Sequence, residues 1–343
     1  MLLIGESLNV ISKKIGAAYK ARDPKPIQEE ALFQREKGMD YIDINLGPAK
    51  KDGHELMPWV VQTVQEVVDD IPLALDTSNI DAIAAALKVY KDTPQPPLIN
   101  SIMVRPERYE PMVPLAVEHN ADFIALMWGP EGLPRDENER AALCVELLYF
   151  ANEAGIPNEK IWVDGIVTPV NIQQPQLMSL MAFMEMLPEI SPGAKSTCGL
   201  SNISNGPPDN LRPILNQTYM VMLQRYGMHS VIADPLDDQL IAIAKGQRQD
   251  GGAEHRVRVE RQRGAVGEDL AGRRVAVGEA RPEDVAGDPA RPAGAGRGPR
   301  PGSTRRLDRA GRHPGGPGDH RPHRGQQGDP GGHRGHRRQH QPG

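Results

Sequence analysis

Short apolar runs alternate along the first 250 residues with segments in which apolar positions recur every three or four residues. Apolar runs of this length, each followed by a helical pattern, indicate parallel strands that are buried on both faces. The pattern predicts eight strands, near residues 2–8, 41–47, 72–78, 97–103, 122–128, 161–168, 195–204 and 229–235.

Helical periodicity fills the intervals between these strands. Apolar residues at i, i+3, i+4 and i+7 are typical of helices that pack one face against a sheet. The predicted helices span residues 27–36, 59–68, 80–90, 108–119, 139–154, 176–187 and 211–226. Eight strand–helix units in about 250 residues predict a (β/α)₈ barrel, also called a TIM barrel, in an α/β protein.

A doubly wound open sheet is the alternative architecture. It is disfavoured because no glycine-rich phosphate loop follows the first strand and no G-x-x-x-x-G-K-S/T motif occurs. The eighth unit is incomplete, since its helical pattern covers residues 236–245 and then stops. We therefore expect a barrel over residues 1–246 whose last helix is short.

The composition changes abruptly near residue 250. Residues 251–343 hold 19 Arg and no Lys against 11 acidic residues, a net charge of +8, while residues 1–250 carry −13. With only two Leu and no Ile or Phe, this segment cannot bury enough apolar surface to offset its ordering entropy. We expect residues 247–343 to be a disordered low-complexity tail. A reading-frame shift in a GC-rich gene explains such a tail better than a basic tail for acidic partners or nucleic acid.

Cysteine and histidine usage bears on the compartment and on metal binding. The two cysteines, Cys144 and Cys198, favour a reducing compartment without a disulfide framework. The sequence shows no leader and no 18-residue apolar stretch, so we expect a cytoplasmic protein that does not enter a membrane. No H-x-H, C-x-x-C or H-E-x-x-H motif occurs, which disfavours a catalytic metal bound by this chain.

Polar residues recur at the carboxyl ends of the predicted strands, which meet at one face of a barrel, where sites are built. Carboxylates and amides without a histidine or a strand-end lysine do not suit nucleophilic triads or Schiff bases. They do suit a heterocycle such as a 2-amino-4-oxopyrimidine, whose adjacent N–H groups a carboxylate can accept in pairs. The candidate pocket collects Glu6, Asn9, Asp43, Asn45, Asp76, Asn100, Asp164, Ser201, Asn202 and Asp234.

Structural roles compete with this interpretation. Asp76 and Asp164 could be helix N-caps, a position that aspartate favours. Asn202 could cap a turn, and Arg212 could cap its helix. Because Asp76, Asn100, Asp164 and Asn202 all fall at strand ends, we favour the pocket over four separate structural roles.

Several of these residues lie in motifs that resemble a known family. Leu75-Asp-Thr-Ser-Asn79, Ile99-Asn-Ser101, Val163-Asp164 and Gly199-Leu-Ser-Asn-Ile-Ser204 follow one another as in the pterin-binding methyltransferases. The resemblance is closest to the methyltetrahydrofolate:corrinoid/iron–sulfur protein methyltransferases, and it covers roughly residues 1–246. The basic tail has no counterpart in that family.

The resemblance implies methyl transfer from N5 of methyltetrahydrofolate to the Co(I) centre of a corrinoid (cobalamin). The corrinoid would be carried by a partner, a corrinoid iron–sulfur protein or a related corrinoid protein, and this chain would bind no metal. It would form a homodimer and would not bind nucleic acid or membranes.

The resemblance also assigns roles by position. Asn202 would be the catalytic residue and would stabilise charge developing at N5. The pterin would contact Asp76, Asn100, Asp164, Gly199, Ser201, Asn202 and Arg212. Residues that would support these contacts or touch the substrate are Glu6, Asp43, Asn45 and Asp234.

Other functions remain open. A dihydropteroate synthase would share the barrel but needs basic groups for a pyrophosphate, and Lys195 lies too early in its strand. The folate-binding domain of a cobalamin-dependent methionine synthase would share most contacts. A pterin- or corrinoid-protein-binding module without activity and a nucleic-acid-binding protein are the alternatives outside the enzymes.

Overall fold

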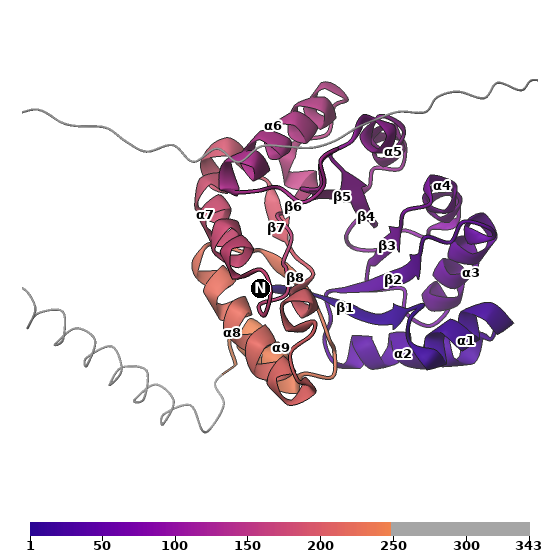
Figure 1. The fold of residues 1–343 in the computed structure, drawn as a ribbon. Helices are drawn as coiled ribbons and strands as arrows, with labels where there is room; N and C mark the ends of the chain where they lie inside the picture. Colours follow the sequence, from indigo (N-terminus) through magenta and orange to yellow (C-terminus); the bar gives the residue numbers. More distant parts are fainter. Residues whose placement is uncertain (248–343) are drawn as a thin grey trace, which may run out of the picture. The chain divides into compact units, whose positions relative to one another are not determined.

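Eight parallel strands surrounded by helices form the centre of the computed structural model, which describes residues 1–247 (Figure 1). The strands appear in the order in which the apolar runs predicted them. Their bounds are β1 Leu2–Asn9, β2 Tyr41–Gly47, β3 Leu73–Thr77, β4 Leu98–Met103, β5 Asp122–Leu126, β6 Ile161–Asp164, β7 Lys195–Thr197 and β8 Ser230–Ala233.

The sheet runs in the order β7-β6-β5-β4-β3-β2-β1-β8, so each strand pairs with its sequence neighbour and β1 pairs with β8. Individual hydrogen bonds, rather than a regular ladder, join β7 to β8. The N–H of Ile232 donates to the carbonyl of Cys198 at 2.8 Å, and Ser230 Oγ donates to the carbonyl of Ser196 at 3.1 Å. This closure confirms the (β/α)₈ barrel.

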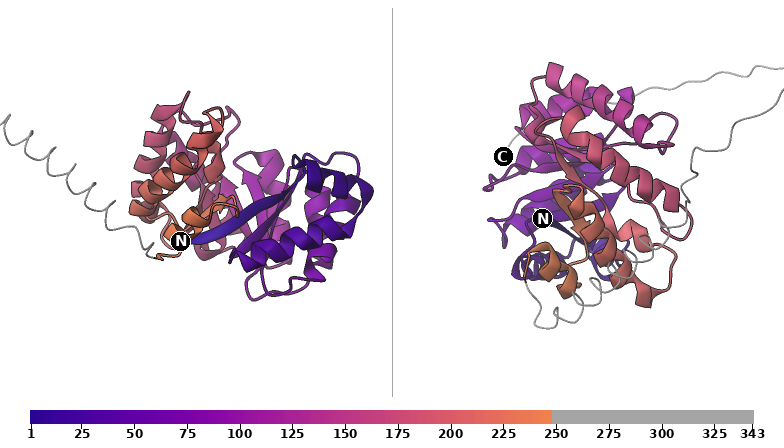
Figure 2. Two further views of the ribbon diagram at one scale, coloured as in Figure 1. Left: turned by 90° about the horizontal axis from the view of Figure 1, so that it is seen from below. Right: turned by 90° about the vertical axis from the view of Figure 1, so that its left-hand side faces the viewer.

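The helices lie outside the ring of strands, with those of the N-terminal half on one side and those of the C-terminal half on the other (Figure 2). No helix among residues 1–247 is long and apolar enough to cross a membrane. Their bounds are α1 Lys13–Ala21, α2 Pro24–Glu36, α3 Gly53–Gln65, α4 Ile80–Val89, α5 Pro106–Glu118, α6 Glu137–Glu153, α7 Gln174–Ile190, α8 Arg212–Arg225 and α9 Asp238–Ala244.

Helix α1 was missing from the sequence prediction. It is nine residues long and buries only Ile15, Ala18 and Tyr19, so few apolar positions mark it in the sequence. Its start is marked by Ser12, whose hydroxyl accepts from the N–H of Ile15. The last helix is short, as expected: α9 has seven residues. The expectations for the tail from residue 248 onward lie outside the described residues.

Two predicted strands are too long. β6 ends at Asp164 and β7 at Thr197, and the 3₁₀ helix Leu200–Ser204 occupies the region that the pattern assigned to the end of β7. Apolar residues continue past both strand ends because the loops there pack into the barrel. Leu200 and Ile203, for example, are buried although they are not in a strand.

An apolar layer fills the lower half of the barrel interior, and it consists of Ile4, Tyr41, Ala74, Leu98, Ile124 and Trp162. Beneath it, at the amino ends of the strands, Asp122 accepts from the indole N–H of Trp162 at 2.9 Å and from Lys195 Nζ at 3.0 Å. Asp122, Trp162 and Lys195 form what we call the barrel floor. The floor and the apolar layer leave only the carboxyl ends, the barrel mouth, for an interior pocket.

Replacing Leu98 by alanine should destabilise the barrel, because Leu98 is fully buried in the interior layer. The loss should be about 2–5 kcal/mol in the free energy of unfolding, measured by urea titration. The matched substitution Val145→Ala removes an exposed side chain on α6 and should change this free energy by less than about 0.5 kcal/mol. Equal effects of the two substitutions would contradict the packed layer.

Candidate functional site

Polar residues from β2, β3 and β4 lie at one level of the barrel mouth. In the strand register Asn45 is opposite Asp76, and Asp76 is opposite Asn100. Parallel strands in register point equivalent side chains to the same face, and here that face is the barrel interior. Three of the residues predicted from separate strand ends are therefore brought together.

Each carboxylate in this group is hydrogen-bonded to an amide side chain of another strand. Asn100 Nδ2 donates to Asp43 Oδ1 at 2.9 Å, and Asn45 Nδ2 donates to Asp76 Oδ2. Oδ1 of Asn45 in turn accepts from the N–H of Gly47 at 2.9 Å. Asp43 and Asn100 are buried. The amides thus hold two carboxylates in place that would otherwise be desolvated without partners.

Burial shifts the titration of both carboxylates upward. Burial raises the pKa of Asp76 to about 7, against the opposing effect of the hydrogen bond from Asn45. Burial, and then the nearby charge of Asp76, raise the pKa of Asp43 well above its usual range. Two close carboxylates in a low-dielectric site resist double ionisation. The Asp43–Asp76 pair therefore holds its protons to a higher pH than isolated aspartates do.

Asp164 sits at the end of β6 and is bonded to two backbone segments. Its Oδ1 accepts from the N–H of Ile166 at 2.7 Å, and the N–H of Gly199 also donates to the carboxylate. Burial raises the pKa of Asp164 to about 6, while these two N–H groups and the charge of Arg140 act in the opposite direction. Asp164 thereby links the ends of β6 and β7.

The loop after β7 carries Gly199, Ser201 and Asn202. Ser201 Oγ donates to Glu6 Oε1 at 2.6 Å, which joins this loop to β1. Asn202 is exposed, and its Oδ1 accepts from Asn205 Nδ2 at 3.2 Å. A Cβ on residue 199 would lie 3.0 Å from Asn202 Nδ2, so the glycine leaves room for the amide.

Glu6, Arg212 and Asp234 lie near one another beside this loop. Burial raises the pKa of Glu6, the hydrogen bond from Ser201 lowers it, and the charges of Asp234 and Arg212 act in opposite directions. Asp234 also accepts from the N–H of Leu236 at 2.9 Å and so shapes the turn after β8. The structure therefore places all eleven predicted site residues at the barrel mouth or in its loops.

The capping roles considered for the two strand-end aspartates are not what the structure shows. The N-cap of α4 is Asn79, whose Oδ1 accepts from the N–H of Ala82 at 3.2 Å. The N-cap position of α7 is Gln173. Asp76 and Asp164 are thus free of a helix-capping role.

Arg140 is a buried residue next to the site that the sequence interpretation missed. It is fully buried on α6 and donates from Nε to the carbonyl of Gly165 at 2.8 Å. A signal was available, because Arg140 falls on the apolar face of its helix with Cys144, Leu147, Leu148 and Ala151. A charged residue at such a position is rarely buried without a polar partner.

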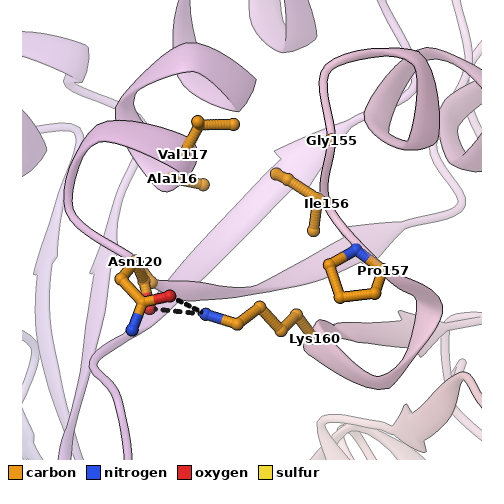
Figure 3. A pocket seen from close by; sticks show the side chains of 8 residues that line it. Ala116, Val117, Asn120, Gly155, Ile156, Pro157 and Lys160 are labelled. Carbon is orange, nitrogen blue, oxygen red and sulfur yellow. Dashed lines mark hydrogen bonds between the residues drawn. The ribbon is translucent and has the colours of Figure 1, made fainter.

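Two cavities at the opposite end of the barrel are not lined by the carboxylates that the mouth contains. One, of about 110 Å³, lies between Asn120 at the end of α5 and Lys160 before β6 (Figure 3). The Lys160 amine donates to the Asn120 carbonyl at 2.9 Å. Another, of about 500 Å³, lies beside the floor residue Lys195. Among residues 1–247 there is no group of three or more His, Cys, Asp or Glu side chains arranged to hold a metal ion.

The sequence profile of the pterin binding enzyme family matches residues 5–234, a span that contains every residue of the mouth described above. The chain belongs to this family. The resemblance that the strand-end motifs suggested is thereby confirmed.

Relatives of this chain include a methyltransferase and a methionine synthase. A methylcorrinoid:tetrahydrofolate methyltransferase of Eubacterium limosum is 28% identical over 237 residues, which are 68% of this chain and 85% of the relative. A methionine synthase of Mycobacterium leprae is 25% identical over 244 residues, which are 68% of this chain but only 20% of that enzyme.

Solved structures of dihydropteroate synthases share the fold. The Xanthomonas albilineans enzyme in complex with 7,8-dihydropteroate has a TM-score of 0.55 and 15% identity, over 71% of this chain and 92% of that one. The Thermus thermophilus enzyme has a TM-score of 0.53 and 20% identity, over 72% of this chain and 94% of that one. At these identities the likeness concerns the barrel alone.

The raised pKa of Asp76 predicts a loss of stability with rising pH. Between about pH 4 and pH 7 the folded protein holds a proton that the unfolded chain has released, so stability present at low pH is lost through this window. Asp76→Asn should remove that part of the loss, roughly 1–3 kcal/mol in urea titrations compared at pH 4.5 and pH 8. The exposed control Asp69→Asn should lose as much stability as wild type. An equal loss of stability between the two pH values in all three proteins would contradict a raised pKa of Asp76.

Proposed function

We propose that this chain transfers the N5-methyl group of methyltetrahydrofolate to the Co(I) centre of a corrinoid carried by a partner protein. The observation that supports this most is the set of buried carboxylates and amides at the mouth of a pterin-binding barrel. A pterin offers the N–H donors that such groups need, and the Eubacterium limosum relative is named for methyl transfer between a methylcorrinoid and tetrahydrofolate.

The hydrogen bonds within the mouth leave specific atoms for the ligand. Among residues 1–247, Asp76 uses Oδ2 to accept from Asn45, and Asn100 uses Nδ2 to donate to Asp43. Oδ1 of Asp76 and Oδ1 of Asn100 are then the atoms that would accept from the pterin. Asp164 would contribute a further carboxylate from β6. Hydrogen bonds to ionised acceptors are about twice as strong as neutral ones, which favours a donor-rich ring.

Asn202 is the residue that would act on the reacting nitrogen. When methyl leaves N5, the electron pair of the broken carbon–nitrogen bond stays on N5, and a donor directed at N5 stabilises the growing charge. Asn205 occupies Asn202 Oδ1, so Nδ2 is the end that can donate. The amide does not titrate, so its role would be electrostatic. The partner's corrinoid supplies the nucleophilic cobalt. The name of the Eubacterium limosum relative describes transfer from a methylcorrinoid to tetrahydrofolate, the reverse direction. The same contacts would serve that direction too.

The mouth also offers an apolar surface for a partner. Ile11, Ile172 and Leu236 are 85%, 72% and 70% exposed, and they follow β1, β6 and β8 respectively. Trp128, which follows β5, is 36% exposed. Exposed apolar residues grouped around one opening are typical of interaction surfaces. They support docking of the corrinoid protein over the mouth, whereas homodimerisation stays a prediction from the resemblance.

Dihydropteroate synthase activity is the alternative within this fold. Its pyrophosphate substrate would call for a basic group at the mouth, for which Lys195 was the candidate on β7. Lys195 instead pairs with Asp122 in the barrel floor. This position favours methyl transfer, and an assay for turnover separates both enzymes from a pterin-binding module without activity.

Binding of methyltetrahydrofolate to the full chain, measured by calorimetry, tests the pocket. Asp76→Ala should weaken binding at least ~10-fold, because it removes a charge-assisted acceptor and leaves Asn45 unpaired. Asp69→Ala removes an exposed carboxylate and should bind like wild type. A folded wild-type protein that does not bind the folate would refute the proposal.

Asn202→Ala should separate binding from chemistry. The dissociation constant for methyltetrahydrofolate should stay within a few-fold of wild type. The rate of methyl transfer to a Co(I) corrinoid protein should fall ~100- to 1000-fold, as for loss of one preorganised donor. Asn205→Ala, which only frees Asn202 to rotate, should cost less. An unchanged rate in Asn202→Ala would assign the chemistry elsewhere.

A further inference from the structure

Arg140 is a buried cation that faces neutral acceptors. It is 0% exposed, and none of the ion pairs found among residues 1–247 includes it. Its three hydrogen bonds go to the Gly165 carbonyl at 2.8 Å, Ser179 Oγ at 2.8 Å and Gln176 Oε1 at 2.6 Å. Burying a charge with neutral partners costs free energy, so packing alone does not explain Arg140.

The acceptors of Arg140 are themselves fixed. Ser179 donates its hydroxyl to Glu137 at 3.0 Å, so its oxygen faces the guanidinium as an acceptor. Gln176 Nε2 donates to the Pro134 carbonyl at 3.0 Å, which turns Oε1 toward Arg140. Helices α6 and α7 thus hold the planar guanidinium in one orientation, and its Nε points at Gly165.

Gly165 belongs to a strained turn directly after Asp164. A Cβ at residue 165 would lie 2.5 Å from Leu180 Cδ1, so helix α7 presses against this backbone. Ile166 has φ +71°, a conformation that a β-branched residue rarely adopts. The same Ile166 donates its N–H to Asp164 Oδ1. Strained backbone at a ligand site persists only where surrounding contacts hold it.

We infer that Arg140 is a positioning residue of the pterin site, which holds the Gly165–Ile166 turn so that Asp164 faces the mouth. The inference rests on the proposed function in so far as Asp164 contacts the pterin. Arg140 also places positive charge behind this carboxylate. The other ionisable groups close to Asp164 or Arg140 are Cys198 just after β7, Tyr219 on α8, and Asp136 and Glu137 at the start of α6. Burial raises the pKa values of Cys198 and Tyr219, so both are neutral at physiological pH.

Arg140→Met and Arg140→Lys separate geometry from charge. In the full chain without ligand, carbon NMR of labelled aspartate should show the Asp164 pKa moving upward in Arg140→Met and staying near wild type in Arg140→Lys. Methyltetrahydrofolate should bind at least ~10-fold more weakly to both variants, since a lysine cannot reproduce the planar three-bond contact. The control Arg35→Met, which removes the exposed ion pair with Asp70, should change neither quantity.

A double-mutant cycle with Asp164→Asn decides whether Arg140 acts through Asp164. In the Asp164→Asn background Arg140→Met should weaken folate binding by no more than ~2-fold, whereas independent effects that multiply would overturn the inference. If Arg140→Met does not fold, the same cycle is run with Arg140→Lys. If wild type does not bind the folate, the proposed function fails. The NMR titration still tests the Arg140–Asp164 link, and an Asp164 pKa in Arg140→Met equal to that of wild type would refute it.

Discussion

The rest of this structure depends on how carboxylates can be buried at the mouth of a barrel. Each one costs free energy unless it is neutralised or hydrogen-bonded. The barrel meets that requirement locally, with an amide side chain from another strand for Asp43 and Asp76 and with backbone N–H groups for Asp164. The compensation is incomplete, since the pKa values of Asp76 and Asp164 remain raised. A donor-rich ligand such as the proposed pterin would complete it, and its binding would then stabilise the fold.

The two ends of the barrel differ in their side chains. At the amino end Asp122 joins Trp162 and Lys195, and these contacts close the interior below the apolar layer. At the carboxyl end the loops are free to differ, and they carry both the polar pocket and the exposed apolar residues around it. Under the proposed function, fold maintenance and ligand recognition would therefore use different residues of the same strands, as is general for this architecture.

Much of this could be predicted from the sequence because strands buried on both faces are nearly continuous apolar runs. A polar residue that interrupts the end of such a run, as Asp76 or Asp164 does, is conspicuous. The ends of β6 and β7 could not be predicted, since buried loop residues such as Leu200 extend the apolar pattern beyond the strand. Arg140 was missed although it lies on the apolar face of its helix, because its partners lie on another helix and in a turn and cannot be identified from the local pattern.

The positions of the tryptophans have an optical consequence. Trp162 lies in the floor with its ring edge-on to Tyr41 at 5.3 Å, and Trp59 lies on α3 under the guanidinium of Arg22 at 5.3 Å. Trp128, by contrast, is partly exposed beside the mouth. Indole emission responds to the polarity around the ring, so a partner that covered the opening would change the light emitted by Trp128. Trp128 is thus an intrinsic fluorophore beside the opening over which the proposed partner would dock.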